Sequence, residues 1–462
     1  MFKYAEDPDV ERAFLLEQYQ ANISAALRPA FASDALPHVA VCASRVAAKW
    51  LSCGVASSIN DIQRVYRLMV SSLDSIRFPS KASNYSPVLM KMKENAMIEA
   101  WAEIYIAAVE QSKEKKENRH KEIPPEGMLN LIESEMKDLR NLWNAVLSDG
   151  VLSQGTESIL HANALLTNNM DYWKGDDGEH KTMVHIIAGY AVEALLRPPS
   201  SISERTCLHY ISALNELPDT SDIFSQPILT RELVCVAHRV LVTRNFDSAI
   251  NRQIGFTALR LALKVCLALP TDQRSNCDDD SVLMSFLEVV SCSVSKIDFT
   301  NPSNSEITVT VVNLISSLPS IVEDGARQRL LTILSYCVGK IISQVVRDNK
   351  NDHRELVGAA LCKIKLLFDV NLILPIILEY LKIPTKEQNI ITATTISTFF
   401  IINYNLSTST MVTMLEIFVH ALQYESLHKH VCSISTSCMK YISNDIKKGF
   451  KFHSKIEGFI NS

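Results

Sequence analysis

Hydrophobic residues recur at helical spacing along nearly the whole chain. The first clear stripe follows positions i, i+3, i+4, i+7, i+8 and i+11 and consists of Val39, Cys42, Ala43, Val46, Ala47 and Trp50. Arg45 and Lys49 fall off this stripe, so we expect both side chains in solvent. The pattern predicts a helix over residues 35–53.

A second helix is predicted directly after the first. Gly54 suits the left-handed conformation that often follows a helix end, and Ser58 with Asp61 has the spacing of a capping box. The apolar stripe of the predicted helix 59–77 consists of Ile62, Val65, Tyr66, Met69, Leu73 and Ile76. The two helices form a predicted αα-hairpin, a unit that is stable mainly when neighbouring hairpins stack on it.

The same spacing continues almost to the end of the sequence. It predicts further helices near 8–27, 87–112, 127–147, 156–168, 181–196, 203–216, 228–243, 247–268, 281–294, 306–317, 324–347, 353–368, 370–382, 387–403, 408–423 and 427–447. No window shows sustained strand alternation. The β-branched stretch ITATTISTFFIINY is ambiguous, and its place between helices of similar length favours helix.

Polar and proline-containing breaks divide these helices. We expect helical hairpin repeats over 1–112, 127–268 and 281–448, a charged, proline-containing linker at 113–126, an acidic loop at 269–280 and a basic-aromatic tail at 449–462. About one helix pair per 50 residues is near the period of HEAT and armadillo repeats. The predicted fold is therefore all-α, an α-solenoid of degenerate HEAT/armadillo-like helical hairpins, with a globular all-α bundle as the alternative.

The composition agrees with a helical protein and argues against some classes of binding partner. The 462 residues are 47% hydrophobic with only 13 Gly and 16 Pro, and the formal net charge is −5. A chain of this length should extend or divide rather than fold around one core. The weakly acidic balance gives no general attraction to nucleic acid or to anionic membranes.

The cysteines and the apolar runs predict a soluble, intracellular protein. The charged start MFKYAEDPDVERAF is unlike a signal peptide, and the run NLILPIILEYL is interrupted by Pro375 and Glu379. Several of the 11 cysteines lie inside apolar helical stretches, and we expect reduced, buried thiols at Cys42, Cys207, Cys235, Cys266, Cys337 and Cys362.

The sequence gives only weak evidence for a metal site. HKHVCSISTSC holds His428, His430, Cys432 and Cys438, but on a helix His430 points away from the face shared by His428 and Cys432. Zinc knuckles use closer Cys pairs, so buried cysteines beside exposed histidines are the preferred interpretation. Asp278, Asp279 and Asp280 lack the other ligands of an EF-hand and would favourably precede a helix.

No motif indicates catalysis or nucleotide binding. The sequence contains neither a P-loop, nor G-x-G-x-x-G, nor G-x-S-x-G. Trp50, Trp101 and Trp143 lie on apolar stripes and are predicted core residues. The run IKKGFKFHSK could contact an anionic membrane, and a frayed last helix is the simpler reading. We therefore predict no catalytic, cofactor-binding or metal-binding residues and no cofactor, and the partner-binding residues stay unknown.

Some segments carry more information than helical spacing alone. They begin with ASRVAAKWLSCGVASSINDIQRVYRLMVSSL and continue with EAWAEIYIAAV, LRNLWNAVLSD, ILHANALL and ELVCVAHRVLVTR. These segments, in this order, resemble the HEAT-repeat-containing protein 5 family, relatives of the yeast large alpha-adaptin accessory protein. The likeness covers much of 31–262. Family members are much longer, so the resemblance implies a C-terminal portion, with NNMDYWKGDDGEH in place of a long polar insertion. The family has no active-site residues to transfer.

What the resemblance implies is a non-enzymatic scaffold of clathrin-dependent traffic between endosomes and the trans-Golgi network. The implied partners are aftiphilin-like and gamma-synergin-like proteins and the trans-Golgi clathrin adaptor, with no nucleic acid and with peripheral, indirect membrane association. One alternative is a HEAT-type scaffold in nuclear transport or in a kinase or phosphatase assembly. Another, of a different class, is a metal-dependent enzyme that uses the 428–438 cluster.

Overall fold

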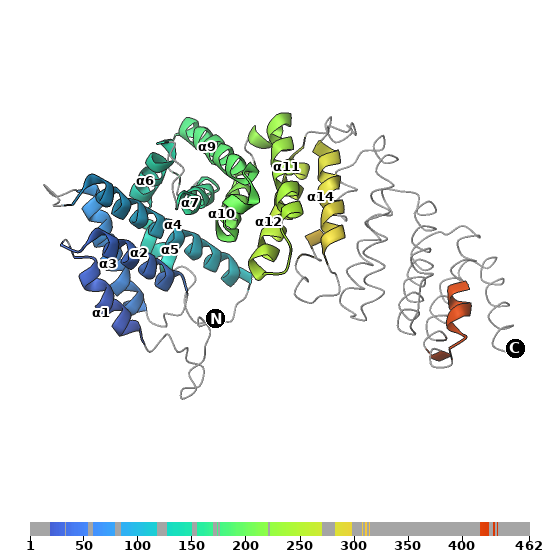
Figure 1. Cartoon of the computed structure of the whole chain (residues 1–462), viewed down its shortest axis with the longest axis horizontal. Coiled ribbons are helices and arrows are strands. Elements are labelled where there is room, and N and C mark those ends of the chain that lie inside the picture. Colours follow the sequence, from blue (N-terminus) through green and yellow to red (C-terminus); the bar gives the residue numbers. More distant parts are fainter. Residues whose placement is uncertain are drawn as a thin grey trace. The chain divides into compact units, whose positions relative to one another are not determined.

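The computed structural model describes residues 19–297 except 33, 54–58, 79–84, 118–126, 150–154, 170–172, 174–175, 220–221 and 270–281, together with 307, 310, 311, 314, 416–424, 428, 429 and 432 (Figure 1). Every regular element among these residues is an α-helix or a 3₁₀ helix. The chain divides into two compact units, Met1–Ser221 and Asp222–Ser462, which are described separately.

The first unit consists of helices joined mostly by short connections. They are α1 (Gln20–Ala30), α2 (Pro37–Ser52), α3 (Ile59–Arg77), α4 (Pro87–Glu117), α5 (Gly127–Glu133), α6 (Met136–Ser148), α7 (Thr156–Thr167), α9 (Asp177–Leu196), the 3₁₀ helix η3 (Pro199–Ser201) and α10 (Glu204–Glu216). The described elements of the second unit are η4 (Asp222–Ser225), α11 (Pro227–Thr243), α12 (Ala249–Ala268) and α14 (Val282–Lys296).

The predicted helices are found throughout the described part, with differences at some ends. The predicted 59–77 coincides with α3. The predicted 127–147 is two helices, because residues 134 and 135 form a turn between α5 and α6. Helix α4 continues past its predicted end at 112 to Glu117. Lys113 supports the extra turn, since its Nζ lies 2.9 Å from Glu216 Oε1 at the end of α10.

The predicted helix 8–27 differs at its end, because α1 continues through Pro29 to Ala30, and residues 8–18 of that prediction lie outside the described residues. Helix α9 begins at Asp177 rather than 181, because Asp177 and Glu179 place negative charge in its first turn, where the helix dipole favours it. The capping residues Gly54 and Ser58 lie outside the described residues. So do most of the helices predicted beyond 297 and most of the linker 113–126.

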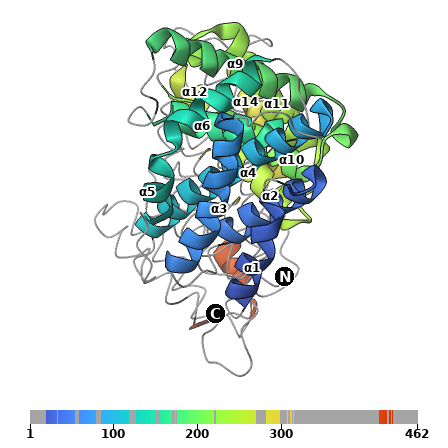
Figure 2. The same cartoon turned by 90° about the vertical axis from the view of Figure 1, so that its left-hand side faces the viewer.

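Helix α4 forms the centre of the first unit. It packs against α2 on one side and α7 on another, and both views show α2 lying alongside it (Figures 1 and 2). Trp101 of α4 is fully buried and meets Tyr66 of α3 edge-on, with ring centroids 5.5 Å apart. Trp143 of α6 is also buried, and its Nε1–H donates to the carbonyl of Ile98 over 3.3 Å. The aromatic residues therefore fix the helices around α4, as predicted for the tryptophans on apolar stripes.

The predicted stripe of α2 is only half right. Ala43, Ala47 and Trp50 are buried, whereas Val39, Cys42 and Val46 are exposed. The side that α2 buries is instead centred on small residues, which are Ala40, Ala43, Ser44, Ala47 and Ala48. Helix α2 packs chiefly against α4, and small side chains let two helices approach closely, so the narrow face is the one turned inward.

The expectation of buried thiols is confirmed for Cys207 and Cys266 and is wrong for Cys42 and Cys235, which are exposed. Cys42 lies on the outward side of α2 for the reason just given. In α11, Leu233, Val234, Val236 and Ala237 are buried around Cys235 and leave it on the opposite side. The described cysteines are all free thiols. Cys337 and Cys362 lie outside the described residues.

The described part of the second unit is an apolar three-helix packing. Helices α11, α12 and α14 contact one another, and α14 buries Leu283, Phe286, Leu287 and Val290. Ser248 caps α12 by accepting a hydrogen bond from the Asn251 N–H over 3.1 Å.

Lys296, at the end of α14, reaches across to the end of α11. Its ammonium donates to the carbonyls of Leu241 at 3.0 Å, Val242, and Arg244 at 3.3 Å. A side chain of α14 thus satisfies carbonyls that α11 itself leaves open.

Candidate functional site

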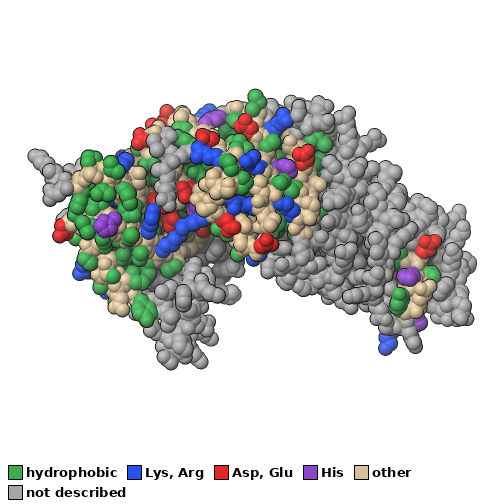
Figure 3. All heavy atoms as spheres, in the orientation of Figure 1, with side chains coloured by type: hydrophobic (Ala, Val, Ile, Leu, Met, Phe, Trp, Pro, Cys, Tyr) green, Lys and Arg blue, Asp and Glu red, His purple; other side chains and the backbone are tan. Residues whose placement is uncertain are grey.

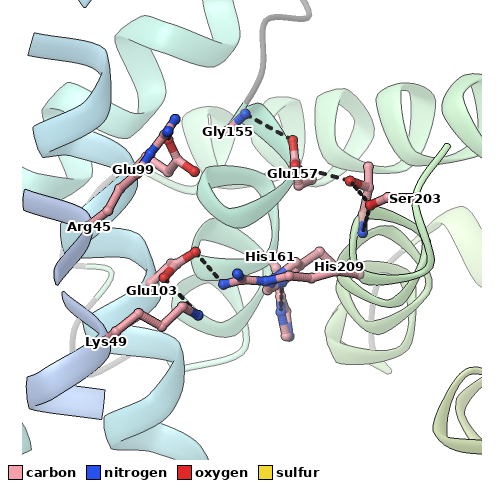
Figure 4. A network of polar contacts seen from close by, with 11 residues as sticks. Arg45, Lys49, Glu99, Glu103, Gly155, Glu157, His161, Ser203 and His209 are labelled. Carbon is pink, nitrogen blue, oxygen red and sulfur yellow. Dashed lines mark hydrogen bonds and ion pairs between the residues drawn. The ribbon is translucent and has the colours of Figure 1, made fainter. Parts of the chain in front are cut away.

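Four helices of the first unit surround a hollow of about 300 Å³ that is lined mainly by charged and polar side chains. We call this hollow the polar cleft. Helix α2 contributes Arg45 and Lys49, α4 contributes Glu99 and Glu103, α7 contributes Glu157 and Ser158, and α10 with its N-cap contributes Ser203, Arg205, Thr206 and His209 (Figure 4).

Helices α2 and α4 meet at the cleft through two ion pairs in the same register. Arg45 Nη2 lies 3.7 Å from Glu99 Oε2, and Lys49 Nζ lies 3.3 Å from Glu103 Oε2. Both pairs step by four residues on both helices, so α2 and α4 run parallel at this point, and each helix presents its charges on one face. The side chains of Arg45 and Lys49 are about half exposed. Those of Glu99 and Glu103 are largely covered.

Helix α10 adds a second cation to one of these glutamates. Arg205 forms an ion pair with Glu103, which therefore lies between Lys49 and Arg205. Such a shared carboxylate ties α2, α4 and α10 together through a single side chain.

The start of α7 brings a third carboxylate to the cleft. Gly155 precedes the helix in the left-handed conformation, with φ of 97°, and its N–H donates to Glu157 Oε2 over 3.1 Å. Thr206 Oγ1 donates to the other oxygen of Glu157 over 3.2 Å. Glu99 approaches the same point, because a Cβ placed on Gly155 would be 2.7 Å from Glu99 Cδ. Only glycine therefore fits both the backbone angle and the space.

The charges around the cleft balance in number but not in position. Glu103 has two cationic partners, and Glu157 has hydrogen bonds but no ion pair among the described residues. Burial raises the pKa of Glu99; Arg45 and Arg205 oppose that shift, while Glu103 and Glu157 add to it. The side of the cleft near Gly155 is therefore richer in negative charge than in positive charge.

A pair of histidines lies between α7 and α10 at the base of the cleft. His161 Nδ1 and His209 Nδ1 are 3.2 Å apart, so one neutral ring donates its Nδ1–H to the other (Figure 4). Burial lowers the pKa of His161 well below its ordinary value and lowers that of His209 to about 4, with nearby Arg205 adding to the second shift. Both rings are neutral at pH 7, and a neutral pair avoids two buried cations in contact.

Two of the candidate metal residues are described. His428 is exposed, as expected, and its Nε2 contacts the carbonyl of Leu422 at 2.8 Å, whereas Cys432 was expected to be buried and is exposed. Within the described residues, no group of three or more His, Cys, Asp or Glu side chains is placed to hold a metal ion. His430, Cys438, the aspartates 278–280 and the tail 449–462 lie outside the described part of the chain.

Sequence reasoning missed the polar cleft. Arg45 and Lys49 are exposed, as expected, and each also pairs with a carboxylate of α4, which that reasoning did not predict. One signal was present, since Glu99 and Glu103 interrupt an otherwise apolar helix at i and i+4. The other residues lie on α7 and α10, so their approach follows from helix packing.

None of the helices in the described part is both long and apolar enough to cross a bilayer. The chemistry of the cleft, with paired charges and hydroxyl groups at the surface, suits the binding of a charged or polar group from another molecule.

Comparison with known proteins agrees with the helical hairpins. Residues 1–152 match the family described as the Laa1/Sip1/HEATR5 HEAT repeat region. The resemblance to the HEAT-repeat-containing protein 5 family is thereby confirmed over that segment, and the fold class is an all-α solenoid of HEAT-type hairpins. For residues 153–262 the resemblance stays a prediction. Repeats of this class serve as protein-binding scaffolds.

One relative is the AP-1 accessory protein LAA1 of Saccharomyces cerevisiae, which is 31% identical over 104 residues. The match covers 21% of this chain and 5% of that protein, so the chain spans a small part of the relative's length. No solved structure is significantly similar to the chain.

Proposed function

We propose that the chain is a non-enzymatic scaffold of clathrin-dependent vesicle traffic between endosomes and the trans-Golgi network, including retrograde transport and protein localisation. The observation that carries the proposal is the family match over residues 1–152 together with the similarity to a protein named as an AP-1 accessory protein. The helical hairpins supply extended surface for protein partners.

The partners that fit this role are the trans-Golgi clathrin adaptor and proteins like aftiphilin and gamma-synergin. In this proposal the protein works in the cytoplasm, at the trans-Golgi network, endosomes and clathrin-coated vesicles. It reaches the membrane peripherally and indirectly, through these partners.

Proximity labelling in cells tests the proposal. The 462-residue chain is fused to a biotinylating enzyme, and the enzyme alone, expressed at the same level, serves as the control. Enrichment of the trans-Golgi clathrin adaptor and aftiphilin-like proteins over the control is the expected result. A well-expressed fusion that enriches neither contradicts the proposal, and enrichment of nuclear-transport or kinase and phosphatase subunits supports the alternative scaffold instead.

A further inference from the structure

An exposed row of apolar side chains follows α2 from its N-cap as far as Val46 and covers the start of α4. The members of this row, which we call the apolar strip, are Leu36, Val39 and Val46 at or in α2, and Val88, Leu89 and Met92 in α4. Val88 is 77% exposed, Val46 51% and Met92 49%. Isolated exposed apolar residues are ordinary, but a contiguous set of this kind marks an interaction surface.

The α2 and α4 members of the apolar strip lie on neighbouring helices, because α2 packs against α4 and the two run in parallel. The ion pairs of the polar cleft fix the register of α2 and α4, and Tyr85 Oη donates to the carbonyl of Asp34 over 3.4 Å just before the two helices begin. Figure 3 shows hydrophobic side chains gathered over the start of α2 and α4, with Lys and Arg and then Asp and Glu side chains beside them.

The apolar strip leads directly into the polar cleft. Val88, Met92, Glu99 and Glu103 are spaced i, i+4, i+11 and i+15, so they share one face of α4. Met92 and Glu99 are separated by about 10 Å along the helix axis and Val88 and Glu99 by about 16 Å, at 1.5 Å per residue. The surface therefore changes from apolar to charged over a distance that a short peptide spans.

The charged end of this surface favours a cation. Among the described residues Glu157 has no ion pair, and Glu99, beside it at Gly155, pairs with Arg45 at 3.7 Å while Arg205 attracts it from further away. Glu103 already has two cationic partners. A further positive side chain placed near Gly155 would meet two carboxylates that are poorly compensated, and partial burial would strengthen that attraction.

We infer that the apolar strip and the polar cleft form one docking groove for a peptide segment of a partner protein. The segment carries two or more apolar side chains for the strip and, about 10–16 Å further along, a Lys or Arg side chain for Glu99 and Glu157. The inference rests on the proposed function in one respect, since it takes the partner to be a protein of the assembled complex.

Peptide selection with the whole 462-residue chain tests the groove. A random 16-residue peptide library displayed on phage is selected against the wild-type chain and against three variants. V88S/M92S removes the apolar character of the strip, and E99Q/E157Q removes the negative charge. I228S is the matched control, because Ile228 is 75% exposed and lies in the second unit. Thermal unfolding by circular dichroism verifies that each variant is folded.

The expected result is an enriched motif of apolar residues followed by Lys or Arg. A peptide with this motif should bind the V88S/M92S variant at least tenfold more weakly than the wild type. The E99Q/E157Q variant should bind Lys and Glu versions of the peptide with similar affinity, whereas the wild type prefers Lys. The I228S variant should match the wild type.

Three results would overturn the inference: no enriched peptide, a motif without a basic residue, or binding that V88S/M92S leaves unchanged. Sedimentation of the same proteins gives a fourth result that would overturn it. If the wild-type chain is a dimer and V88S/M92S is a monomer, the apolar strip binds a second copy of the chain. Proximity labelling separates the two proposals. If the wild-type fusion labels no adaptor but the peptide motif binds, the proposed function fails and the groove stands.

Discussion

Both units are built from packed helices, but different kinds of side chains lie where those helices meet. Where α2, α4, α7 and α10 meet in the first unit, the side chains include three glutamates, three cations and a histidine pair. Where α11, α12 and α14 meet in the second, the buried side chains of α12 and α14 are mostly aliphatic and aromatic. Lys296 crosses this second junction to carbonyl groups of the backbone.

This difference suggests that stability and binding specificity depend on different contacts in a helical repeat. Apolar packing is non-directional and gives most of the stability, whereas charged networks are directional and gain little net energy when buried. In the first unit a charged, partly exposed junction lies on one side of α4, and the buried Trp101 and Trp143 pack at that helix as well. We therefore expect the stability of this unit to depend on the aromatic residues and its specificity on the cleft.

Removing one aromatic anchor from each unit should have the largest effect. Trp143→Ala and Phe286→Ala each delete a fully buried ring, which typically costs about 3–5 kcal/mol. The four tryptophans lie in the first unit, so urea unfolding followed by tryptophan fluorescence reports that unit, while circular dichroism reports both. Trp143→Ala should shift the fluorescence transition and Phe286→Ala should leave it in place. Equal shifts from both variants would mean that the units unfold together.

Adding one methyl group at a glycine of each unit should have the next largest effect. Gly155→Ala places Cβ 2.7 Å from Glu99 Cδ at a positive φ, and Gly255→Ala places it against Cε1 of the Phe246 ring. Each should destabilise its unit by about 1–3 kcal/mol, through strain and overpacking. Gly189→Ala is the control, because nothing lies within 4 Å of its Cβ and a helical alanine should stabilise.

Double variants show whether the contact with Glu99 or Phe246 causes the loss of stability in the glycine variants. Combining Gly155→Ala with Glu99→Ala should recover part of the loss in the first unit, and Gly255→Ala with Phe246→Ala should do so in the second. Additive losses in the urea midpoints would exclude these contacts as the source of the strain.

The neutral histidine pair should make the first unit sensitive to acid. The pKa of His209 is lowered to about 4, and full burial lowers that of His161 well below its ordinary value. The unfolded chain therefore binds more protons below about pH 6.5, and stability that is present above that pH is lost as the pH falls through about 4. The loss between pH 7 and pH 4 should be about 1–3 kcal/mol.

Two variants separate this effect from other titrations. His209→Asn keeps a hydrogen-bonding group without a titrating ring, and its urea midpoint should fall less between pH 7 and pH 4. Glu99 acts with the opposite sign, because its pKa is raised in the folded state and its protonation at low pH favours folding. Glu99→Gln should therefore make the acid loss steeper, and an unchanged profile in both variants would contradict the assignment.

Thiol labelling compares how readily the two units open, without any substitution in the chain. Cys42 of the first unit and Cys235 of the second are exposed, whereas Cys207 of the first and Cys266 of the second are buried, so the described residues offer an exposed and a buried thiol in each unit. A disulfide reagent should react at once with the exposed pair and with the buried pair only as each unit opens in urea. Mass spectrometry assigns the sites. Immediate reaction of Cys207 and Cys266 in the absence of urea would contradict their burial.

Helix positions in the described part could be predicted from the sequence because each depends on local spacing. Helix α3 shows this well, since its predicted stripe includes the buried Val65, Tyr66, Met69 and Leu73. Helix α2 shows the limit of the method. Ala40, Ser44 and Ala48 look neutral in a hydrophobic pattern, and their burial depends on how closely α4 approaches.

The polar cleft was harder to foresee than the helices. Its ion pairs join residues of different helices, such as Arg205 and Glu103, and no local pattern relates them. Trp173 is similar, because it stands in a polar stretch of sequence and is nevertheless 1% exposed, under the guanidinium of Arg140. Such contacts are set by tertiary packing, which a single sequence does not display.

The reach of Lys296 has a practical consequence for dividing the chain. A fragment that ended within 270–281 would contain α11 and α12 complete but would lose the ammonium group that bonds to Leu241, Val242 and Arg244. The carbonyls at the end of α11 would then turn to water, and the buried face that α14 covers would be open. Expression boundaries in this region are therefore better placed after Ile297, so that each hairpin keeps the helix that closes it.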